Sequence, residues 1–431
     1  MGSVSDHHCD VLILGGGIFG TSTAYHLALT HPDPSRITVL DRAYVPSPEA
    51  ASSDINKIVR ADYSKAFYMD LAYEAMESWT NDPLIKEYFH RTGWVMLDEK
   101  DSDLADRIRK NFRESGRTDT SADITLDDVK SRWGGVLSGI DTSGYSKAYT
   151  NSSAGWADAS SAVEAMMDKA VSTGVKQEVG DIDDLVSDAQ KLTGVRTTDG
   201  RTFTAEKILL ATGAWTPALM ARLEMTMNIP EKDSIQKQIQ AAGVCVAAFK
   251  LSEEEARHYS QMPVLIYGAR GEVMCPNRER WFKFTNANTF MNTRPHPVTG
   301  QDISVPALDQ KSVPRALQEQ SIEIISQRVP EILDNGRVPD DWRLCWDAVS
   351  PDQNQLITRH PDPRLANLYL ATAGSFHSWK FLPSIGKYVV NVLNGKSNGQ
   401  EKDEAWAWKR TWSERGAHEK VLPKTQLADF Q

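Results

Sequence analysis

The chain has 431 residues, of which 40% are hydrophobic and 25% are charged, and its formal net charge is −10 at pH 7. This composition is typical of a soluble globular protein, and a chain of this length predicts two domains. The acidic balance comes without a block of lysine or arginine residues, which argues against a nucleic-acid partner. No stretch approaches the roughly 20 apolar residues that a membrane-spanning helix needs, so we expect no membrane partner.

The four cysteines lie far apart and form no Cys-x-x-Cys motif and no Cys/His cluster; they are Cys9, Cys245, Cys275 and Cys345. This spacing argues against structural zinc and against a disulfide framework, and it favours a reducing, intracellular setting. We therefore predict no metal site.

Residues 9–42, CDVLILGGGIFGTSTAYHLALTHPDPSRITVLDR, follow the order strand, turn, helix, loop, strand. The first strand leads into Gly15-x-Gly17-x-x-Gly20, in which the glycines allow a tight turn, a close approach to a pyrophosphate and close helix packing. Asp41 ends the second strand 21 positions after Gly20, where a carboxylate can bind ribose hydroxyls. The segment predicts a dinucleotide site, and the motif alone leaves FAD and NAD open.

Two later segments predict further parts of the same domain. A helix at 157–174, a strand VKQEV, a hairpin KLTGVRTTDGRTF and an apolar strand at 207–215 follow one another. That last strand ends in a small residue, Gly213 and an aromatic residue, an ending that lets the backbone come close to a ligand. A third strand, LYLATAGS (368–375), precedes a helix that begins near Pro383. One cofactor domain is therefore predicted to use three separated segments.

Lys380 stands between Trp379 and Phe381 in the largely apolar stretch TAGSFHSWKFLPSIGKYVV. Burying a lone ammonium among aromatic rings is costly unless an anion compensates the lost hydration. Two interpretations follow from the residues alone: Lys380 reaches out to water from the rim of a strand or turn, or it lines a cavity that receives an anion.

Several motifs in the right order give the chain a family resemblance. They are the N-terminal glycine motif, SSDINKIVRADY (52–63), HRTGWVML (90–97), ATGAW (211–215), RWFKFT (280–285), CWDAVSPDQNQLITRHP (345–361) and HSWKFLPSIGKYVV. With these motifs the chain resembles the FAD-dependent amine oxidases that include monomeric sarcosine oxidase, L-pipecolate oxidase, saccharopine oxidase and the fructosyl amino acid oxidases, or amadoriases. The sequence of the last motif most resembles the saccharopine and pipecolate oxidase branch.

The resemblance implies an α/β fold in which a GxGxxG-type FAD-binding domain is interleaved with an α+β substrate domain built on a mixed or antiparallel sheet. We place the FAD-binding domain at 1–80, 150–220 and 335–395, the substrate domain at 81–149 and 221–334, and a helical tail at 396–431.

The resemblance also implies a covalent flavin, because the family bonds the cysteine at the position of Cys345 to the 8α carbon. A small buried hydrophobe is the alternative that the residue alone would favour. Two departures from the family are visible: Thr358 replaces an acid, and Asp347 replaces the second cysteine of the amadoriases.

By the resemblance, Lys380 and Arg60 bind the substrate carboxylate, and Trp379 shapes the substrate slot. His377 is assigned to the substrate site too, and it stands where the amadoriases carry an arginine. Without the resemblance, a surface salt bridge is the expected role of Arg60.

Two catalytic lysines are also implied: Lys283 for oxygen activation, and Lys57 over the flavin ring. Solvated lysines on a strand face are the alternative. The complete predicted cofactor site comprises Gly15, Gly17, Ile18, Gly20, Asp41, Arg42, Ser52, Ser53, Lys57, Val179, Gly213, Trp215, Cys345, Asp347, Gly374, Phe376 and Lys380.

The predicted activity is FAD-dependent oxidation of a carboxylate-bearing secondary amine, such as saccharopine, pipecolate or an N-alkyl amino acid, to an imine, with O2 as acceptor and H2O2 as product. Oxidation of fructosyl amino acids, and an alkaloid-pathway reaction in which the imine is trapped by ring closure, are the alternatives. An NAD(P)H-using flavin enzyme would need a second GxGxxG motif, which the sequence lacks. A non-catalytic flavin-binding protein would have no use for Lys283, Arg60 and Lys380 together.

We expect a monomer whose partners are a small amine and O2. The start, MGSVSDHH, has no apolar signal segment, and the end, LADFQ, is not an SKL-type peroxisomal signal. The expected location is cytoplasmic, with a peroxisomal one left open by the family.

Overall fold

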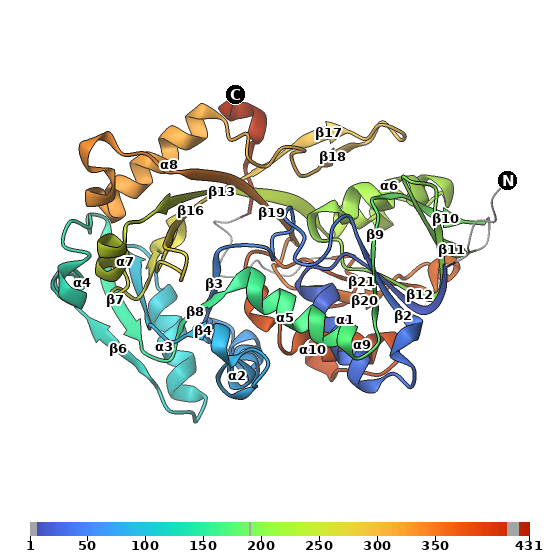
Figure 1. Cartoon of the computed structure of the whole chain (residues 1–431), viewed down its shortest axis with the longest axis horizontal. Coiled ribbons are helices and arrows are strands. Elements are labelled where there is room, and N and C mark those ends of the chain that lie inside the picture. Colours follow the sequence, from blue (N-terminus) through green and yellow to red (C-terminus); the bar gives the residue numbers. More distant parts are fainter. Residues whose placement is uncertain (1–6, 189–190, 412–421) are drawn as a thin grey trace.

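The structure is a computed structural model that describes residues 7–188, 191–411 and 422–431. Two large β-sheets form the framework, one in the right half of Figure 1 and the other in the left half and along the top. The chain crosses between the two sheets several times, so each sheet collects strands from distant parts of the sequence.

The first large sheet has eight strands and is mainly parallel. Its strands are β1 (His7–Leu14), β2 (Ile37–Asp41), β9 (Lys176–Val179), β10 (Ile182–Ser187), β11 (Leu192–Thr197), β12 (Thr202–Leu210), β20 (Leu356–Arg359) and β21 (Leu368–Thr372). Strand β1 lies between β2 and β12 and runs parallel to both, while β10 and β11 form an antiparallel hairpin beside β12. The continuous apolar runs of β1, β2 and β12 fit strands that are covered on both faces.

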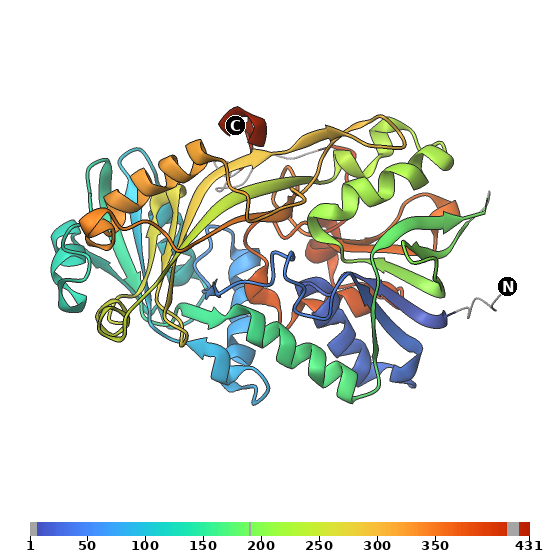
Figure 2. The same ribbon diagram turned by 45° about the horizontal axis from the view of Figure 1, so that its top comes forward.

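Helices cover this sheet on both sides. They are α1 (Ile18–Thr30), α5 (Ala159–Ser172) and α9 (Ile385–Leu393) on one face, with α6 (Thr216–Thr226) on the other. In Figure 2, α5 runs below the strands and α6 lies above them. Gly386 allows α9 to touch α1, because a Cβ at this position would lie 2.1 Å from the Ser22 carbonyl oxygen.

The second large sheet has nine strands and is mainly antiparallel. Its strands are β5 (Trp94–Glu99), β6 (Ser121–Ile124), β7 (Tyr145–Asn151), β13 (Gln240–Lys250), β14 (Val264–Tyr267), β15 (Gly271–Met274), β16 (Trp281–Met291), β19 (Asp341–Val349) and β22 (Thr425–Gln426). Only the β5–β14 and β16–β22 pairs among these are parallel. The sheet is therefore mixed, as predicted.

The remaining elements lie outside the two large sheets. They are the helices α2 (Ala66–Asn81), α3 (Leu104–Glu114), α4 (Leu126–Ser131), α7 (Glu253–Tyr259), α8 (Arg315–Arg328) and α10 (Gln400–Ala405), the three-stranded sheet β3 (Asn56–Val59), β8 (Gly155–Asp158) and β4 (Phe89–His90), and the pair β17 (Thr293–Pro295) and β18 (Asp302–Ser304). No helix in the described part of the chain is long and apolar enough to cross a membrane.

The predicted fold class is confirmed, and the predicted segment boundaries can be compared with the sheets. Segment 335–395 spans both sheets, because β19 belongs to the nine-stranded sheet while β20 and β21 belong to the eight-stranded one. The predicted helical tail, 396–431, contains α10 but also β22, which pairs with β16. The division into an FAD-binding and a substrate domain stays a prediction.

Candidate active site

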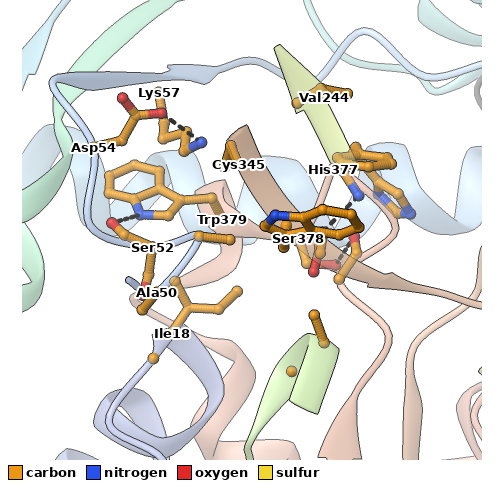
Figure 3. Close-up of a pocket in the computed structure, with 18 of the residues that line it drawn as sticks. Ile18, Ala50, Ser52, Asp54, Lys57, Val244, Cys345, His377, Ser378 and Trp379 are labelled. Carbon is orange, nitrogen blue, oxygen red and sulfur yellow. Dashed lines mark hydrogen bonds and ion pairs between the residues drawn. The ribbon is translucent and has the colours of Figure 1, made fainter. Parts of the chain in front are cut away.

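A cavity of about 580 Å³ lies where the carboxyl ends of the parallel strands face the nine-stranded sheet. Ligands of open α/β sheets bind at this edge, because loops diverge there and leave a crevice. Figure 3 shows its centre, with Lys57, Cys345 and Trp379 converging from different elements. The loop 47–60 and the segment 374–380 close the sides.

Most of the predicted site residues line this cavity. They are Gly15, Gly17, Ile18, Asp41, Arg42, Ser52, Lys57, Arg60, Gly213, Trp215, Cys345, Asp347, Gly374, Phe376, His377, Trp379 and Lys380. Gly20, Ser53, Val179 and Lys283 are predicted site residues that do not line it. Among the described residues, no group of three or more His, Cys, Asp or Glu side chains could hold a metal ion.

The glycine motif at the start of α1 has the geometry that the sequence predicts. Gly15 adopts φ +95°, and a Cβ there would lie 2.6 Å from the Ala211 carbonyl oxygen. A Cβ on Gly20 would lie 1.9 Å from the Gly15 carbonyl oxygen, so Gly20 supports the turn without lining the cavity. Both positions therefore require glycine.

The N-terminus of α1 fits the pyrophosphate of a dinucleotide. Its N-cap is Gly17, no side chain caps it, and its first turn holds no acidic residue. The free N–H groups and the helix dipole favour an anion there. The Asp41 carboxylate accepts a hydrogen bond from the Gly16 N–H at 2.6 Å, and burial raises its pKa. The free N–H donors and the Asp41 carboxylate fit the pyrophosphate and the ribose of a dinucleotide such as FAD.

The segment after β21 is strained where it meets the cavity. Ala373, Ser375 and Phe376 have φ values of +64°, +48° and +62°. The left-handed region is costly for residues other than glycine, and such strain concentrates at functional sites. The Asp347 carboxylate accepts the Phe376 N–H at 2.8 Å, which helps to hold this conformation. Burial raises the pKa of Asp347.

Two lysines share one buried carboxylate beside the cavity. Asp54 Oδ2 lies 2.7 Å from Lys57 Nζ and 2.9 Å from Lys283 Nζ. Lys283 is 1% exposed and also donates to the Asn56 carbonyl at 2.7 Å, so it lies behind Asp54 instead of at the cavity surface. Burial alone would raise the pKa of Asp54, but the lysine charges lower it well below its usual range. The three groups carry one net positive charge.

Lys380 is buried at the cavity wall. Its Nζ donates to the Tyr63 hydroxyl at 3.0 Å and to the His377 carbonyl at 2.6 Å, and both acceptors are neutral. Burial, and then the charge of Arg60, lower the pKa of Lys380 well below its ordinary value. Among the described residues it forms no direct ion pair. The interpretation in which Lys380 reaches out to water is wrong, because the side chain is 5% exposed.

His377 and Trp379 are fixed by the protein itself. His377 lies 2.8 Å from the Gln353 carbonyl through Nε2 and 3.3 Å from the Tyr63 hydroxyl through Nδ1. The indole N–H of Trp379 donates to the Ser52 carbonyl at 3.2 Å (Figure 3). Both side chains therefore shape the cavity with their rings.

Arg60 lies over two aromatic rings, 4.6 Å from the ring centre of Tyr63 and 4.8 Å from that of Trp94. One of its nitrogens donates to the Asp62 carbonyl. Asp62 itself is buried and accepts hydrogen bonds from Tyr149 and Asn151. Burial raises its pKa to about 6, against the opposing charge of Arg60.

The sequence analysis overlooked Asp54, Asp62, Tyr63 and Glu272. The first three lie inside the motif SSDINKIVRADY, and the spacing of Asp54 three residues before Lys57 was a usable signal. Glu272 lines the cavity from β15 and has no such local signal.

Residues 10–392 match the family model described as FAD dependent oxidoreductase. The chain belongs to this FAD-dependent oxidoreductase family. The predicted family resemblance and the prediction of FAD as the cofactor are confirmed at this level. Members of this family depend on FAD, and the glycine turn and Asp41 fit the pyrophosphate and the ribose of that dinucleotide.

Individual relatives cover almost the whole chain. L-saccharopine oxidase of Schizosaccharomyces pombe is 27% identical, over 93% of both chains. Among solved structures, a thermally stable mutant of a fructosyl peptide oxidase is 28% identical, with a TM-score of 0.85 and 98% of both chains covered. The fructosamine oxidase Amadoriase II of Aspergillus fumigatus, solved in complex with FSA, is 28% identical, with a TM-score of 0.80, 94% of this chain and 90% of that chain covered.

The raised pKa of Asp62 predicts a pH-dependent stability. The folded protein holds this proton more tightly than the unfolded chain, whose carboxyl has a pKa near 3.8, so stability falls as pH rises from about 4 through 6. A shift of about two units is worth about 3 kcal/mol. Between pH 4 and pH 7, the unfolding free energy of wild type should therefore fall by roughly this amount relative to that of Asp62→Asn, as measured in urea titrations. The exposed Asp101→Asn is the control, and parallel pH profiles for Asp62→Asn and wild type would contradict the assignment.

Proposed function

We propose that the protein is an FAD-dependent oxidase of a secondary amine that carries a carboxylate. The observation that supports this most strongly is the placement of Lys380 and Arg60 at the wall of the dinucleotide cavity, where neither forms a direct ion pair among the described residues. Lys380 is buried and Arg60 is half-buried, and a substrate carboxylate would compensate the hydration that they lose.

When bound, FAD would take a hydride equivalent from the carbon beside the amine nitrogen, leaving an imine, and would pass the electrons to O2 to give H2O2. The α1 N-terminus and Asp41 would hold the dinucleotide. Lys380 and Arg60 would grip the carboxylate, which orients the amine within the cavity. The surrounding positive charges also lower the pKa of a bound amine, which favours the neutral form that can be oxidised.

Saccharopine, pipecolate and N-alkyl amino acids are the substrate classes that we rank first. The saccharopine oxidase among the relatives supports this order. Fructosyl amines are the second class, supported by the amadoriase structures. His377 stands where we expect an amadoriase arginine, which weighs against fructosyl amines.

The imine can be hydrolysed or trapped by ring closure, and mass spectrometry of the products distinguishes the two outcomes. The monomeric state and the cytoplasmic location stay predictions.

A peroxide-coupled screen tests the proposal directly. We expect H2O2 from at least one member of a panel of saccharopine, pipecolate, sarcosine and fructosyl-lysine, with no NAD(P)H consumed. Flavin reduction under anaerobic conditions is the second readout. If no N-substituted amino acid reduces the flavin, the proposed function is wrong.

Lys380→Met and Arg60→Met should each weaken binding of the carboxylate substrate by about 10- to 100-fold, because a charge-assisted hydrogen bond is worth about 1.5–3 kcal/mol. The substrate amide should bind wild type and both variants with similar, low affinity. Titration of the flavin absorbance measures these constants. Lys387→Met, on the exposed side of α9, is the matched control. Wild-type affinity in both site variants would mean that the two cations serve packing alone.

Cys345 is proposed to hold the flavin through a thioether. Its side chain lies in the cavity with Val244 on the neighbouring strand (Figure 3). Bond formation removes one hydrogen from the thiol and one from the 8α methyl group, and O2 accepts the two electrons. Flavin should stay with the precipitate when wild type is denatured in acid, and Cys345→Ala should release it. Cys245→Ala, on the adjacent strand β13, is the control that should retain it. Complete release from wild type would disprove the link.

Lys283 is proposed to promote the reaction with oxygen. The net positive charge of the Lys57, Asp54 and Lys283 group would stabilise the negative charge that develops on O2 as it accepts electrons. Lys283→Met should therefore slow reoxidation by roughly 100- to 1,000-fold, the usual loss for one preorganised electrostatic group, and slow reduction by substrate much less. Stopped-flow spectroscopy separates the two half-reactions. Equal slowing of both would assign Lys283 a structural role.

A further inference from the structure

One row of side chains crosses four neighbouring strands and lines the cavity. Met96 on β5 pairs with Ile266 on β14, Ile266 pairs with Glu272 on β15, and Glu272 pairs with Thr285 on β16. All four line the cavity, so they share one face of the nine-stranded sheet. Glu272 is the only acidic member of this row.

In the described part of the chain the Glu272 carboxylate is compensated only at a distance, by the charges of Lys57, Lys380 and the buried Arg328. Its carboxylate accepts one hydrogen bond, from the Thr285 hydroxyl at 3.3 Å, and in the described part of the chain it forms no ion pair. Apolar side chains from α3, Leu104 and Ile108, line the same cavity. A half-buried carboxylate in such surroundings loses hydration that a single hydroxyl does not replace.

The backbone at Glu272 is firmly held. Arg328, at the end of α8, is fully buried and donates through Nη1 to the Glu272 carbonyl at 3.3 Å and the Thr285 carbonyl at 3.1 Å. Its other terminal nitrogen donates to the Arg270 carbonyl. This clamp fixes β15 against β16 and so keeps the carboxylate at the cavity wall.

The cavity therefore presents charges of both signs that form no direct ion pair with one another. Arg60 and the ammonium form of Lys380 are positive, and the charge of Glu272 acts to raise the pKa of Lys380, against the larger effect of burial. Separated charges of both signs complement a ligand that is itself a zwitterion.

The nitrogen that Glu272 binds should differ from the one that is oxidised. The reacting amine must be neutral to give up a hydride, whereas a nearby carboxylate stabilises the protonated form. A second nitrogen, which stays charged throughout the reaction, has no such conflict. The apolar side chains of Leu104 and Ile108 suit methylene groups between the two nitrogens.

We propose that Glu272 selects substrates that carry a primary ammonium group in addition to the carboxylate-bearing secondary amine. This inference rests on the proposed function and narrows its substrate class to diamino acids such as side-chain N-substituted lysines. Glu272 then binds the ammonium group while Lys380 and Arg60 hold the carboxylate next to the reacting carbon.

A matched pair of ligands tests the inference. Nε-carboxymethyl-lysine has the secondary amine, its carboxylate and a free α-ammonium group, and its Nα-acetyl derivative lacks only that positive charge. Calorimetric titration of the FAD-loaded enzyme should give at least 10-fold tighter binding of the free amine. In Glu272→Gln this preference should fall to less than threefold, with the affinity for the acetylated ligand unchanged. Glu254→Gln, exposed on α7, should keep the wild-type preference.

The outcomes separate this inference from the proposed function. Equal binding of the two ligands by wild type, binding of neither, or an equal loss for both in Glu272→Gln would overturn the role of Glu272. If Glu272→Gln abolishes the preference but neither ligand reduces the flavin, the ammonium site stands and the oxidase proposal falls. Reduction of the flavin by both ligands at equal kcat/KM would leave the oxidase proposal intact and disprove the selection.

Discussion

The shared carboxylate of Asp54 joins the two parts of the site. It lies in the loop that leaves the eight-stranded sheet, and it pairs with Lys57 on β3 and with Lys283 on β16. Removing one partner of such a buried group leaves an uncompensated charge, which typically costs about 3–5 kcal/mol. The loop is also fastened from β19, where Arg343 donates to the Ser53, Pro48 and Ala50 carbonyls. The cavity depends on these contacts for its position between the sheets.

The opposite wall is built from strained backbone and a buried cation. Left-handed conformations at Ala373, Ser375 and Phe376 turn the chain from the end of β21 into the cavity. The same turn places Lys380 beside the Tyr63 hydroxyl instead of in solvent. Such strain persists only where the surrounding structure holds it. Here the Asp347 carboxylate accepts the Phe376 N–H, and the ring of Trp379 stacks on that of Trp79 with 5.3 Å between the ring centres. The Lys380 side chain of this wall therefore faces the cavity.

Charged side chains of both signs line the cavity. The group around Asp54 carries net positive charge at one wall, and Lys380 with Arg60 adds two further cations. Glu272 supplies the opposite sign from the nine-stranded sheet, at a site that Arg328 holds in place. Each charge lies in surroundings of low polarity, where pairing with a ligand is worth more than in water. We therefore expect the number and sign of a ligand's charges to influence its binding in this cavity.

The sequence by itself determined the features that depend on short stretches of chain. The glycine turn and Asp41 belong to one continuous strand–turn–helix–strand segment, so their arrangement follows from local backbone geometry. The motifs around Lys57, Lys380 and Cys345 identified the family. Only the tertiary structure decided which of these side chains meet. Lys283 lies on the predicted strand, yet Asp54 separates it from the cavity. The two residues are 229 positions apart, so no local sequence pattern predicts their contact. Glu272 became visible only through the register of β5, β14, β15 and β16, because strand pairing is set by long-range packing that local patterns do not encode.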